Sequence, residues 1–234
     1  MFVSIVIGGM IGLGKTSVAD ILQSHFTSKG IESKVFYEAV DDNPILPLYY
    51  QLTPEELDAK RIPFLLQLFF LNKRFKTVKD CINWNNPIYT IQDRSIYEDW
   101  YFAYVNKNLG RISALEFNIY EELVDNMLEE LAELPKKAPD LMVYLKGSFD
   151  TVLDRIMDRG RSFEINPELK EYYFEVWKGY DEWVMKRYDA SEVLIIDMDQ
   201  TDVVNSRADA IRVCQDVEQK LNEILFSVKK AHIG

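Results

Sequence analysis

Residues 9–16 are Gly9-Met10-Ile11-Gly12-Leu13-Gly14-Lys15-Thr16, and they come shortly after an apolar run at residues 2–7. This phosphate loop (residues 9–16) has the GxxxxGK[ST] pattern, in the required order of strand, loop and helix. Its glycines let backbone N–H groups turn toward phosphates, which Lys15 can also reach, while the Thr16 hydroxyl can bind Mg²⁺. A chance glycine-rich turn of this kind is expected in roughly one chain in a hundred. The sequence therefore predicts ATP binding by residues 9–16 together with Ser17.

Short apolar runs alternate along the chain with longer segments whose apolar residues recur at intervals of three and four. This alternation is typical of right-handed βαβ units and predicts an α/β fold, with a five-stranded parallel sheet flanked by helices. We expect strands at residues 2–7, 34–37, 88–91, 141–145 and 193–196, and helices at residues 17–28, 62–82, 114–134, 149–159, 167–188 and 203–225. We expect a single domain at residues 1–226 and a disordered tail at residues 227–234.

The composition argues against several classes of protein. The 234 residues carry 27 Lys and Arg against 38 Asp and Glu, a formal net charge of −11, whereas nucleic-acid binding needs a basic face. A membrane span needs about 18 uninterrupted apolar residues, and an export signal needs a basic residue before its apolar run. The sequence has no such apolar stretch, and no basic residue precedes residues 2–7, so we expect a soluble protein with neither feature. Cys81 and Cys214 lie far apart without ligand-spaced neighbours, so we expect no disulfide, no zinc and a reducing, cytoplasmic location.

Charged residues follow the second and third expected strands. Glu38 closes one strand and Asp93-Arg94 closes the other, and in an open parallel sheet both ends face the crevice beside the phosphate loop. Glu38 can take a proton from an attacking hydroxyl, while Arg94 neutralises charge on the transferred group. The alternatives are a solvated strand end for Glu38, and a helix N-cap followed by a surface arginine for Asp93-Arg94.

Three arginines gather near one helix end. Arg155 and Arg159 lie one helical turn apart, and Arg161 follows the glycine that ends the helix. They can clamp nucleotide phosphates as part of a mobile lid. The alternative is a surface helix whose arginines pair with Asp154 and Asp158.

Together these features resemble the deoxyribonucleoside kinase family, in its deoxycytidine, deoxyguanosine and deoxyadenosine kinase group, and most of all its bacterial deoxyadenosine kinase branch. Thymidylate and adenylate kinases share the phosphate loop and the lid but not the segments between them. The resemblance implies a P-loop kinase fold with an arginine-rich lid and ATP as donor. It covers the phosphate loop, the Glu38 segment, Leu66-Gln67 with Lys73-Arg74, Asp93-Arg94-Ser95-Ile96-Tyr97-Glu98-Asp99, and residues 155–164.

The resemblance also implies roles for individual residues. It makes Glu38 the general base for the substrate 5′-hydroxyl and Arg94 its partner at the phosphoryl group, beside Lys15. Gln67 matches the amide that binds the nucleobase, which suits a group that both donates and accepts. Arg74 and Asp99 form a pair beneath the base in members that phosphorylate cytosine or purine nucleosides.

The sugar and base sites leave alternatives open. Tyr50 and Glu164 fall where the family holds the sugar 3′-hydroxyl, although Tyr49 is a second candidate. The position four residues after Asp99, aromatic in several relatives, is Ala103 here. Either Phe102 shifts in register or the pocket is roomier, and a roomier pocket would favour purines.

The resemblance extends to metal, assembly and regulation. It implies Mg²⁺ bound by Thr16 and, through water, by Asp93, which replaces the Glu of many relatives. It also implies a homodimer through helices at residues 61–83 and 114–134, and feedback inhibition by deoxynucleoside triphosphates.

We therefore predict a kinase that transfers the ATP γ-phosphate to the 5′-hydroxyl of a purine deoxynucleoside, foremost deoxyadenosine, giving dAMP and ADP. Deoxyguanosine and deoxycytidine are alternative substrates. A nucleoside monophosphate kinase would need a basic acceptor site, where this chain has Glu38 and Asp99. A nucleotide sensor without turnover would not need Glu38 as a base.

Overall fold

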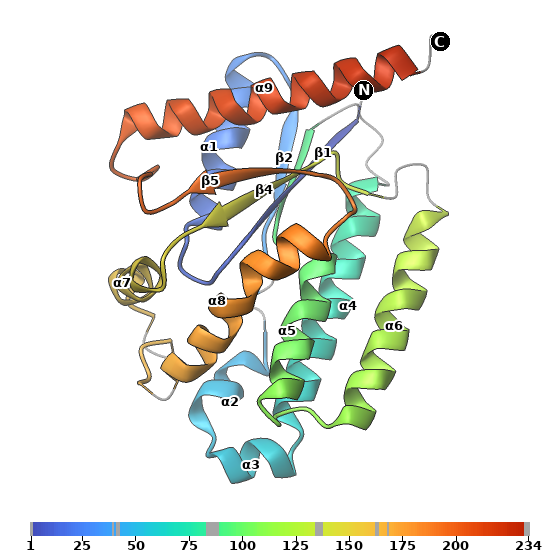
Figure 1. Cartoon of the computed structure of the whole chain (residues 1–234), viewed down its shortest axis with the longest axis vertical. Helices are drawn as coiled ribbons and strands as arrows, with labels where there is room; N and C mark the ends of the chain where they lie inside the picture. The colour runs from blue at the N-terminus through green and yellow to red at the C-terminus, as the bar shows by residue number, and fades with distance from the viewer. Residues whose placement is uncertain are drawn as a thin grey trace.

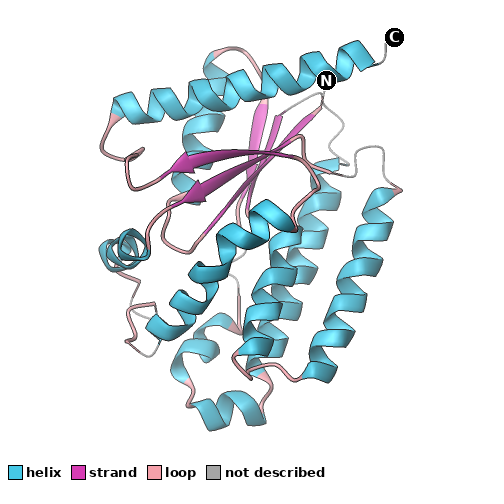
Figure 2. Cartoon of the chain, viewed as in Figure 1, coloured by secondary structure: helices cyan, strands magenta, loops and turns pink. Residues whose placement is uncertain are grey.

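The computed structural model describes residues 2–38, 40, 43–82, 89–133, 138–161, 164–167 and 169–231. Five parallel strands form one sheet in the order β2-β3-β1-β4-β5 (Figure 2). The strands are β1 (Val3–Gly9), β2 (Ser33–Phe36), β3 (Tyr89–Asp93), β4 (Leu141–Lys146) and β5 (Glu192–Asp197). The expected α/β class with a five-stranded parallel sheet is confirmed.

The helices pack on both faces of this sheet. Figure 1 shows α1 and α9 on one side, α4, α5, α6 and α8 on the other, and α2 and α3 at the end of the molecule farthest from α9. Their bounds are α1 (Lys15–Ser28), α2 (Leu46–Gln51), α3 (Pro54–Ala59), α4 (Ile62–Ile82), α5 (Ile96–Asn108), α6 (Ala114–Ala132), α7 (Phe149–Arg159), α8 (Leu169–Lys186) and α9 (Arg207–Ala231).

The central strand explains why this sheet forms. Every residue of β1 is buried, as expected for a strand covered by helices on both faces. It pairs with β3 and β4, and Ile7 of β1 lies in register with Asp93 of β3. The carboxyl ends of β1, β2 and β3 therefore open at one edge, which brings the phosphate loop close to the residues that follow β2 and β3.

Helix α5 is absent from the helices that the sequence predicts. Its buried residues lie on several sides of the helix, so they form no single apolar stripe of helical period. Ser95 caps its first turn reciprocally with Glu98, and this Ser-x-x-Glu capping box was the available sequence signal. The short helices α2 and α3 also lie outside the predicted set.

The C-terminal helix corrects a second prediction. Helix α9 continues through Ala231, so residues 227–231 are helical rather than part of a disordered tail. Residues 232–234 lie outside the described part of the chain, as do residue 88 of the third expected strand and residue 134 of the third expected helix. Among the described helices, none is both long enough and apolar enough to cross a membrane.

Candidate active site

The phosphate loop connects β1 to α1, and its path requires glycine. Gly9 has φ 138°, and a Cβ atom here would lie 2.6 Å from the carbonyl oxygen of Leu145. The Lys15 ammonium donates hydrogen bonds to the carbonyl oxygens of Gly9 at 3.1 Å and Met10 at 3.0 Å. Burial, together with the charge of Arg94, lowers the pKa of Lys15 to about 8. An anionic ligand would offset the cost of burying this charge.

A hydroxyl and a carboxylate meet beside the loop. Thr16 Oγ1 donates a 2.6 Å hydrogen bond to Oδ2 of Asp93 at the end of β3. The other oxygen, Oδ1, is buried without a hydrogen-bond partner among the described residues. Such oxygens suit Mg²⁺, which takes one or two carboxylates and completes its shell with water and phosphates. No cluster of three His, Cys, Asp or Glu side chains that could hold a metal occurs in the described ranges.

Glu38 lies between two buried arginines. Its Oε1 is 3.2 Å from Nε of Arg94 and 3.2 Å from Nη2 of Arg74. Arg74 also forms a bidentate pair with Asp99, with Nε to Oδ2 at 2.7 Å and Nη2 to Oδ1 at 2.9 Å. Burial opposes ionisation of Glu38, but Arg94, Arg74 and Lys15 outweigh it and lower its pKa to about 2. Glu38 is therefore an ionised carboxylate at the carboxyl edge of the sheet, not a solvated strand end.

The backbone of Arg94 is strained. It has φ 75°, a left-handed conformation that costs a non-glycine residue about 1–2 kcal/mol. Its N–H donates to the carbonyl oxygen of Ile7 at 2.9 Å, and its guanidinium lies 4.6 Å from the ring centroid of Phe102. The side chain is only 4% exposed, which excludes the surface-arginine alternative. Strain of this kind persists where the surrounding contacts hold it, often at functional sites.

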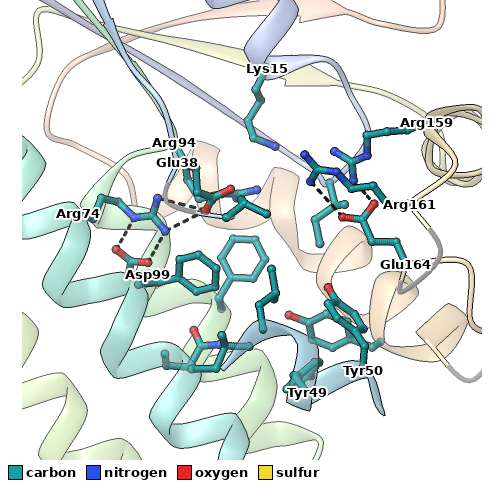
Figure 3. A pocket seen from close by; sticks show the side chains of 18 residues that line it. Lys15, Glu38, Tyr49, Tyr50, Arg74, Arg94, Asp99, Arg159, Arg161 and Glu164 are labelled. Atoms are coloured by element: carbon teal, nitrogen blue, oxygen red, sulfur yellow. Dashed lines mark hydrogen bonds and ion pairs between the residues drawn. The ribbon is translucent and has the colours of Figure 1, made fainter. Parts of the chain in front are cut away.

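A first pocket opens from Glu38 toward α2, α4 and α5. Figure 3 shows Arg74 and Asp99 on one wall and Tyr50 and Glu164 on the opposite wall. The expected base-binding and sugar-binding residues thus line one cavity. Its lining comprises Ile11, Lys15, Glu38, Val40, Leu46, Tyr49, Tyr50, Leu66, Gln67, Phe70, Arg74, Arg94, Asp99, Phe102, Arg159, Arg161, Glu164 and Tyr172.

The two candidate tyrosines differ in their surroundings. The Tyr49 hydroxyl accepts a hydrogen bond from Arg111 Nη1 at 2.5 Å and donates one of 3.4 Å to Asn106 Oδ1. The Tyr50 hydroxyl interacts with Tyr173. Burial raises the pKa of Tyr50 well above its usual value, as do neighbouring tyrosines and Glu164. Tyr49 is thus held by Arg111 and Asn106, whereas Glu164 is among the charges that act on Tyr50.

Phe102 and Ala103 point to different parts of the molecule. Phe102 lines the first pocket, whereas Ala103 is fully buried in a second core cluster with Leu71 and Phe117. The aromatic ring at the pocket therefore belongs to residue 102, whereas the resemblance implies an aromatic residue at position 103. Ala103 does not line the pocket, so the small side chain at this position neither widens the pocket nor favours purines.

The lid arginines take two different positions. Arg159 and Arg161 both form ion pairs with Glu164, the latter at 3.5 Å. Arg155 instead donates to backbone carbonyl oxygens, to Leu13 at 3.3 Å and to Met198 at 2.7 Å. Arg155 thus braces the phosphate loop against the segment after β5, while Arg159 and Arg161 face the cavity.

A second pocket lies against the phosphate loop. It is lined by Gly12, Gly14, Lys15, Thr16, Ser17, Tyr37, Glu38, Val40, Asp93, Arg155, Asp158, Arg159, Arg161, Asp202, Val203, Val204 and Asn205. Lys15, Glu38, Val40, Arg159 and Arg161 line both pockets. Two ligands can therefore meet at a place with one carboxylate and three cationic side chains, as transfer of a phosphoryl group requires.

Comparison with known proteins identifies the family of this chain. The family described as "Deoxynucleoside kinase" matches residues 5–222. The chain belongs to the deoxynucleoside kinase family. A deoxyguanosine kinase of Lactobacillus acidophilus is 42% identical over 223 residues, 94% of this chain and 91% of that protein. A deoxyadenosine kinase of the same organism is 40% identical over 94% of this chain and 97% of its own length. The structure of a deoxyadenosine kinase from M. mycoides with bound dATP has a TM-score of 0.71 and 27% identity, covering 94% of this chain and 99% of that one.

The chain is thus a deoxynucleoside kinase, with the P-loop kinase fold, and the structure adds residues around its site that the sequence did not indicate. Glu98 and Tyr180 contact Arg94 and Gly9 behind the pockets, and Arg111 holds Tyr49. From sequence alone, a Glu in the first turn of a helix is explained by capping, and a Tyr in an aromatic helix is explained by core packing. Neither residue type therefore points to a functional site. Only the position of Glu98 three residues after Ser95 carried a signal, and it indicated a cap.

Proposed function

We propose that this kinase transfers the γ-phosphate of ATP to the 5′-hydroxyl of a purine deoxynucleoside, with deoxyadenosine as the first candidate. The observation that carries the proposal is the position of Glu38, which lines both pockets between Arg74 and Arg94. The nucleoside would occupy the first pocket, with its base near Gln67 and its sugar near Tyr50 and Glu164. The triphosphate would occupy the second pocket against the phosphate loop.

Chemical roles follow from these positions. The ionised Glu38 accepts the proton of the 5′-hydroxyl as that oxygen bonds to the γ-phosphorus, and the bond to the β-phosphate oxygen breaks, releasing ADP. Arg94 and Lys15 offset the negative charge on the transferred group, and Arg159 and Arg161 move from Glu164 to the phosphates. Mg²⁺, bound by Thr16 and through water by Asp93, would neutralise phosphate charge when present.

The purine preference is supported by relatives and by chemistry. The two Lactobacillus acidophilus relatives are named for deoxyguanosine and deoxyadenosine at 42% and 40% identity. An amide such as that of Gln67 can donate to and accept from the edge of adenine. Because the two relatives match almost equally, deoxyguanosine is the second candidate.

We also propose a homodimer and inhibition by deoxynucleoside triphosphates. Leu115 is 70% exposed and Ile119 53% exposed on α6, and these apolar residues one turn apart would be covered by a partner helix. A triphosphate whose nucleoside fills the first pocket would extend its phosphates toward Lys15. A reducing, cytoplasmic location agrees with the free thiols of Cys81 and Cys214.

The test is ADP release from MgATP with deoxyadenosine, deoxyguanosine, deoxycytidine, thymidine and AMP as separate acceptors. We expect the highest kcat/KM with deoxyadenosine. A higher value with deoxyguanosine would name the second candidate. A preference for a pyrimidine nucleoside would refute the purine proposal, and activity with AMP alone would move the acceptor to a nucleoside monophosphate.

A further inference from the structure

A second buried carboxylate lies behind the site. The Glu98 side chain is fully buried. Its Oε1 lies 3.2 Å from Nη1 of Arg94 and accepts a 3.4 Å hydrogen bond from the N–H of Gly9. Its Oε2 accepts a 2.7 Å hydrogen bond from the N–H of Ser95. Glu98 therefore connects the guanidinium of Arg94 to the first residue of the phosphate loop.

Tyr180 of α8 completes this contact. Its hydroxyl donates a hydrogen bond to Oε1 of Glu98 and accepts one of 3.1 Å from the N–H of Gly9. The Tyr180 ring stacks on Tyr144 of β4, with centroids 5.6 Å apart and an angle of 1° between the planes. A Cβ atom at Gly8 would lie 3.6 Å from Oε1 of Glu98, so the carboxylate packs closely against β1. Glu98 and Tyr180 are both buried, so this arrangement excludes solvent.

Arg94 is shared between two acids. Glu38 contacts its Nε and Glu98 contacts its Nη1, both at 3.2 Å. If Glu38 were its only partner, the guanidinium would move whenever the Glu38 carboxylate moved. A second partner, which is fully buried, holds it in one place. Neither Glu98 nor Tyr180 is among the residues that line the two pockets.

We propose that Glu98 and Tyr180 are positioning residues for phosphoryl transfer, which hold the Arg94 guanidinium at a fixed place relative to the phosphate loop. This inference rests on the role proposed above for Arg94. Because neither residue lines the pockets, their loss should slow the chemical step and leave the binding of both substrates almost unchanged.

The test compares Glu98→Gln and Tyr180→Phe in the full chain by steady-state kinetics with MgATP and the preferred deoxynucleoside. Glu98→Gln keeps the volume but removes the charge, and kcat should fall about 10- to 100-fold. Tyr180→Phe removes one hydroxyl, and kcat should fall about 3- to 10-fold. Both KM values should stay within about 3-fold of wild type. The matched control is Tyr144→Phe. It removes a hydroxyl that donates a hydrogen bond to Asp181 and keeps the ring that stacks on Tyr180. The kcat of this variant should equal that of wild type.

The variant Arg94→Lys distinguishes the positioning role of Glu98 and Tyr180 from the proposed role of Arg94 in phosphoryl transfer. It should be slow itself, because an ammonium lacks the fork that reaches both acids. Adding Glu98→Gln to it should then cause little further loss, since the two residues act through one contact. Unchanged kcat in Arg94→Lys would refute the role of Arg94 and this inference with it. A slow Arg94→Lys beside wild-type kcat in Glu98→Gln and Tyr180→Phe would refute the inference alone.

Two further outcomes are decisive. A rise in KM for the deoxynucleoside at unchanged kcat would place Glu98 in acceptor binding and overturn the positioning role. If thermal unfolding shows that Glu98→Gln does not fold, Tyr180→Phe decides the matter, because loss of one hydroxyl leaves the rest of the contact in place.

Discussion

Oε1 of Glu38 lies 3.2 Å from Nε of Arg94, on a carboxylate that is 20% exposed beside an arginine that is 4% exposed. The arginine is thus fixed and the acid faces the cavity. Because Arg94, Arg74 and Lys15 outweigh the effect of burial, the pKa of Glu38 falls to about 2. The carboxylate is therefore ionised at neutral pH and can accept a proton at the moment that charge develops on the substrate oxygen.

Replacement of Glu38 by Gln tests this role. The amide occupies the same volume but cannot take the proton, so kcat should fall by about 10²- to 10⁴-fold. The matched control is Glu32→Gln, which makes the same change at an exposed position just before β2 and should leave kcat unchanged. Steady-state ADP release measures both. Turnover of Glu38→Gln near the wild-type rate would exclude Glu38 as the base.

The pH profile follows from the two shifted groups. Lys15, with its pKa lowered to about 8, loses its proton as the pH rises through that value, and the neutral amine no longer attracts phosphates. Glu38, with a pKa of about 2, stays ionised throughout the acidic range of the assay. We expect kcat/KM for ATP to fall above about pH 8, with no decline near pH 6 that is due to Glu38.

Bound triphosphate supplies negative charge beside Lys15 and raises its pKa, so the decline in kcat should lie at higher pH than the decline in kcat/KM. Direct quantification of ADP across the pH range gives both curves, and circular dichroism at each pH confirms that the protein stays folded. If kcat and kcat/KM declined at the same alkaline pH, Lys15 would not be the titrating group.

Tyr49 and Tyr50 should respond differently to loss of their hydroxyls. If Tyr50 binds the sugar, Tyr50→Phe lowers the preference for deoxyadenosine over 2′,3′-dideoxyadenosine by about 10- to 100-fold in kcat/KM. Tyr49→Phe should keep that preference and lower the melting temperature instead, because Arg111 and Asn106 lose a buried partner. The reverse pattern would assign the sugar contact to Tyr49.

The pair of Arg74 and Asp99 should contribute strongly to stability. The two side chains are 7% and 2% exposed, so Asp99→Ala leaves a buried guanidinium short of a partner and should cost about 3–5 kcal/mol in the free energy of unfolding. Asp80→Ala on α4 breaks an exposed pair with Lys76 and should cost no more than about 1 kcal/mol. Urea denaturation of both variants gives the comparison. Similar small losses would mean that the buried pair adds little stability.

The unpartnered oxygen of Asp93 leads to a prediction about metal. Asp93→Asn replaces one carboxylate oxygen by an amide nitrogen, so half-maximal activity should need about 10- to 100-fold more free Mg²⁺. Asp158→Asn makes the same change elsewhere in the second pocket and should leave the Mg²⁺ requirement unchanged. An Mg²⁺ titration at constant ATP distinguishes the two. Equal requirements in both variants would remove Asp93 from the metal site.

Much of the site could be predicted because its parts are local in sequence. The phosphate loop is one continuous segment, and Glu38 and Asp93-Arg94 directly follow strands of a parallel sheet, whose carboxyl ends meet at one edge. The sheet itself could be predicted from alternating apolar segments, since burial on both faces selects such runs. Helix α5 could not, because it is buried on several sides and shows no helical stripe.

What could not be predicted depends on contacts between distant segments. Glu98 meets Tyr180 across 82 positions of sequence, and the choice between Tyr49 and Tyr50 depends on Arg111, 62 positions from Tyr49. Motif and period report local backbone conformation and which face is buried, so they indicate the sheet and a phosphate site. The nucleoside acceptor was implied by the resemblance to deoxyribonucleoside kinases. The partner of each buried charge is set by how helices from the whole chain pack together, because a buried ion needs whichever opposite charge or donor that packing brings within reach.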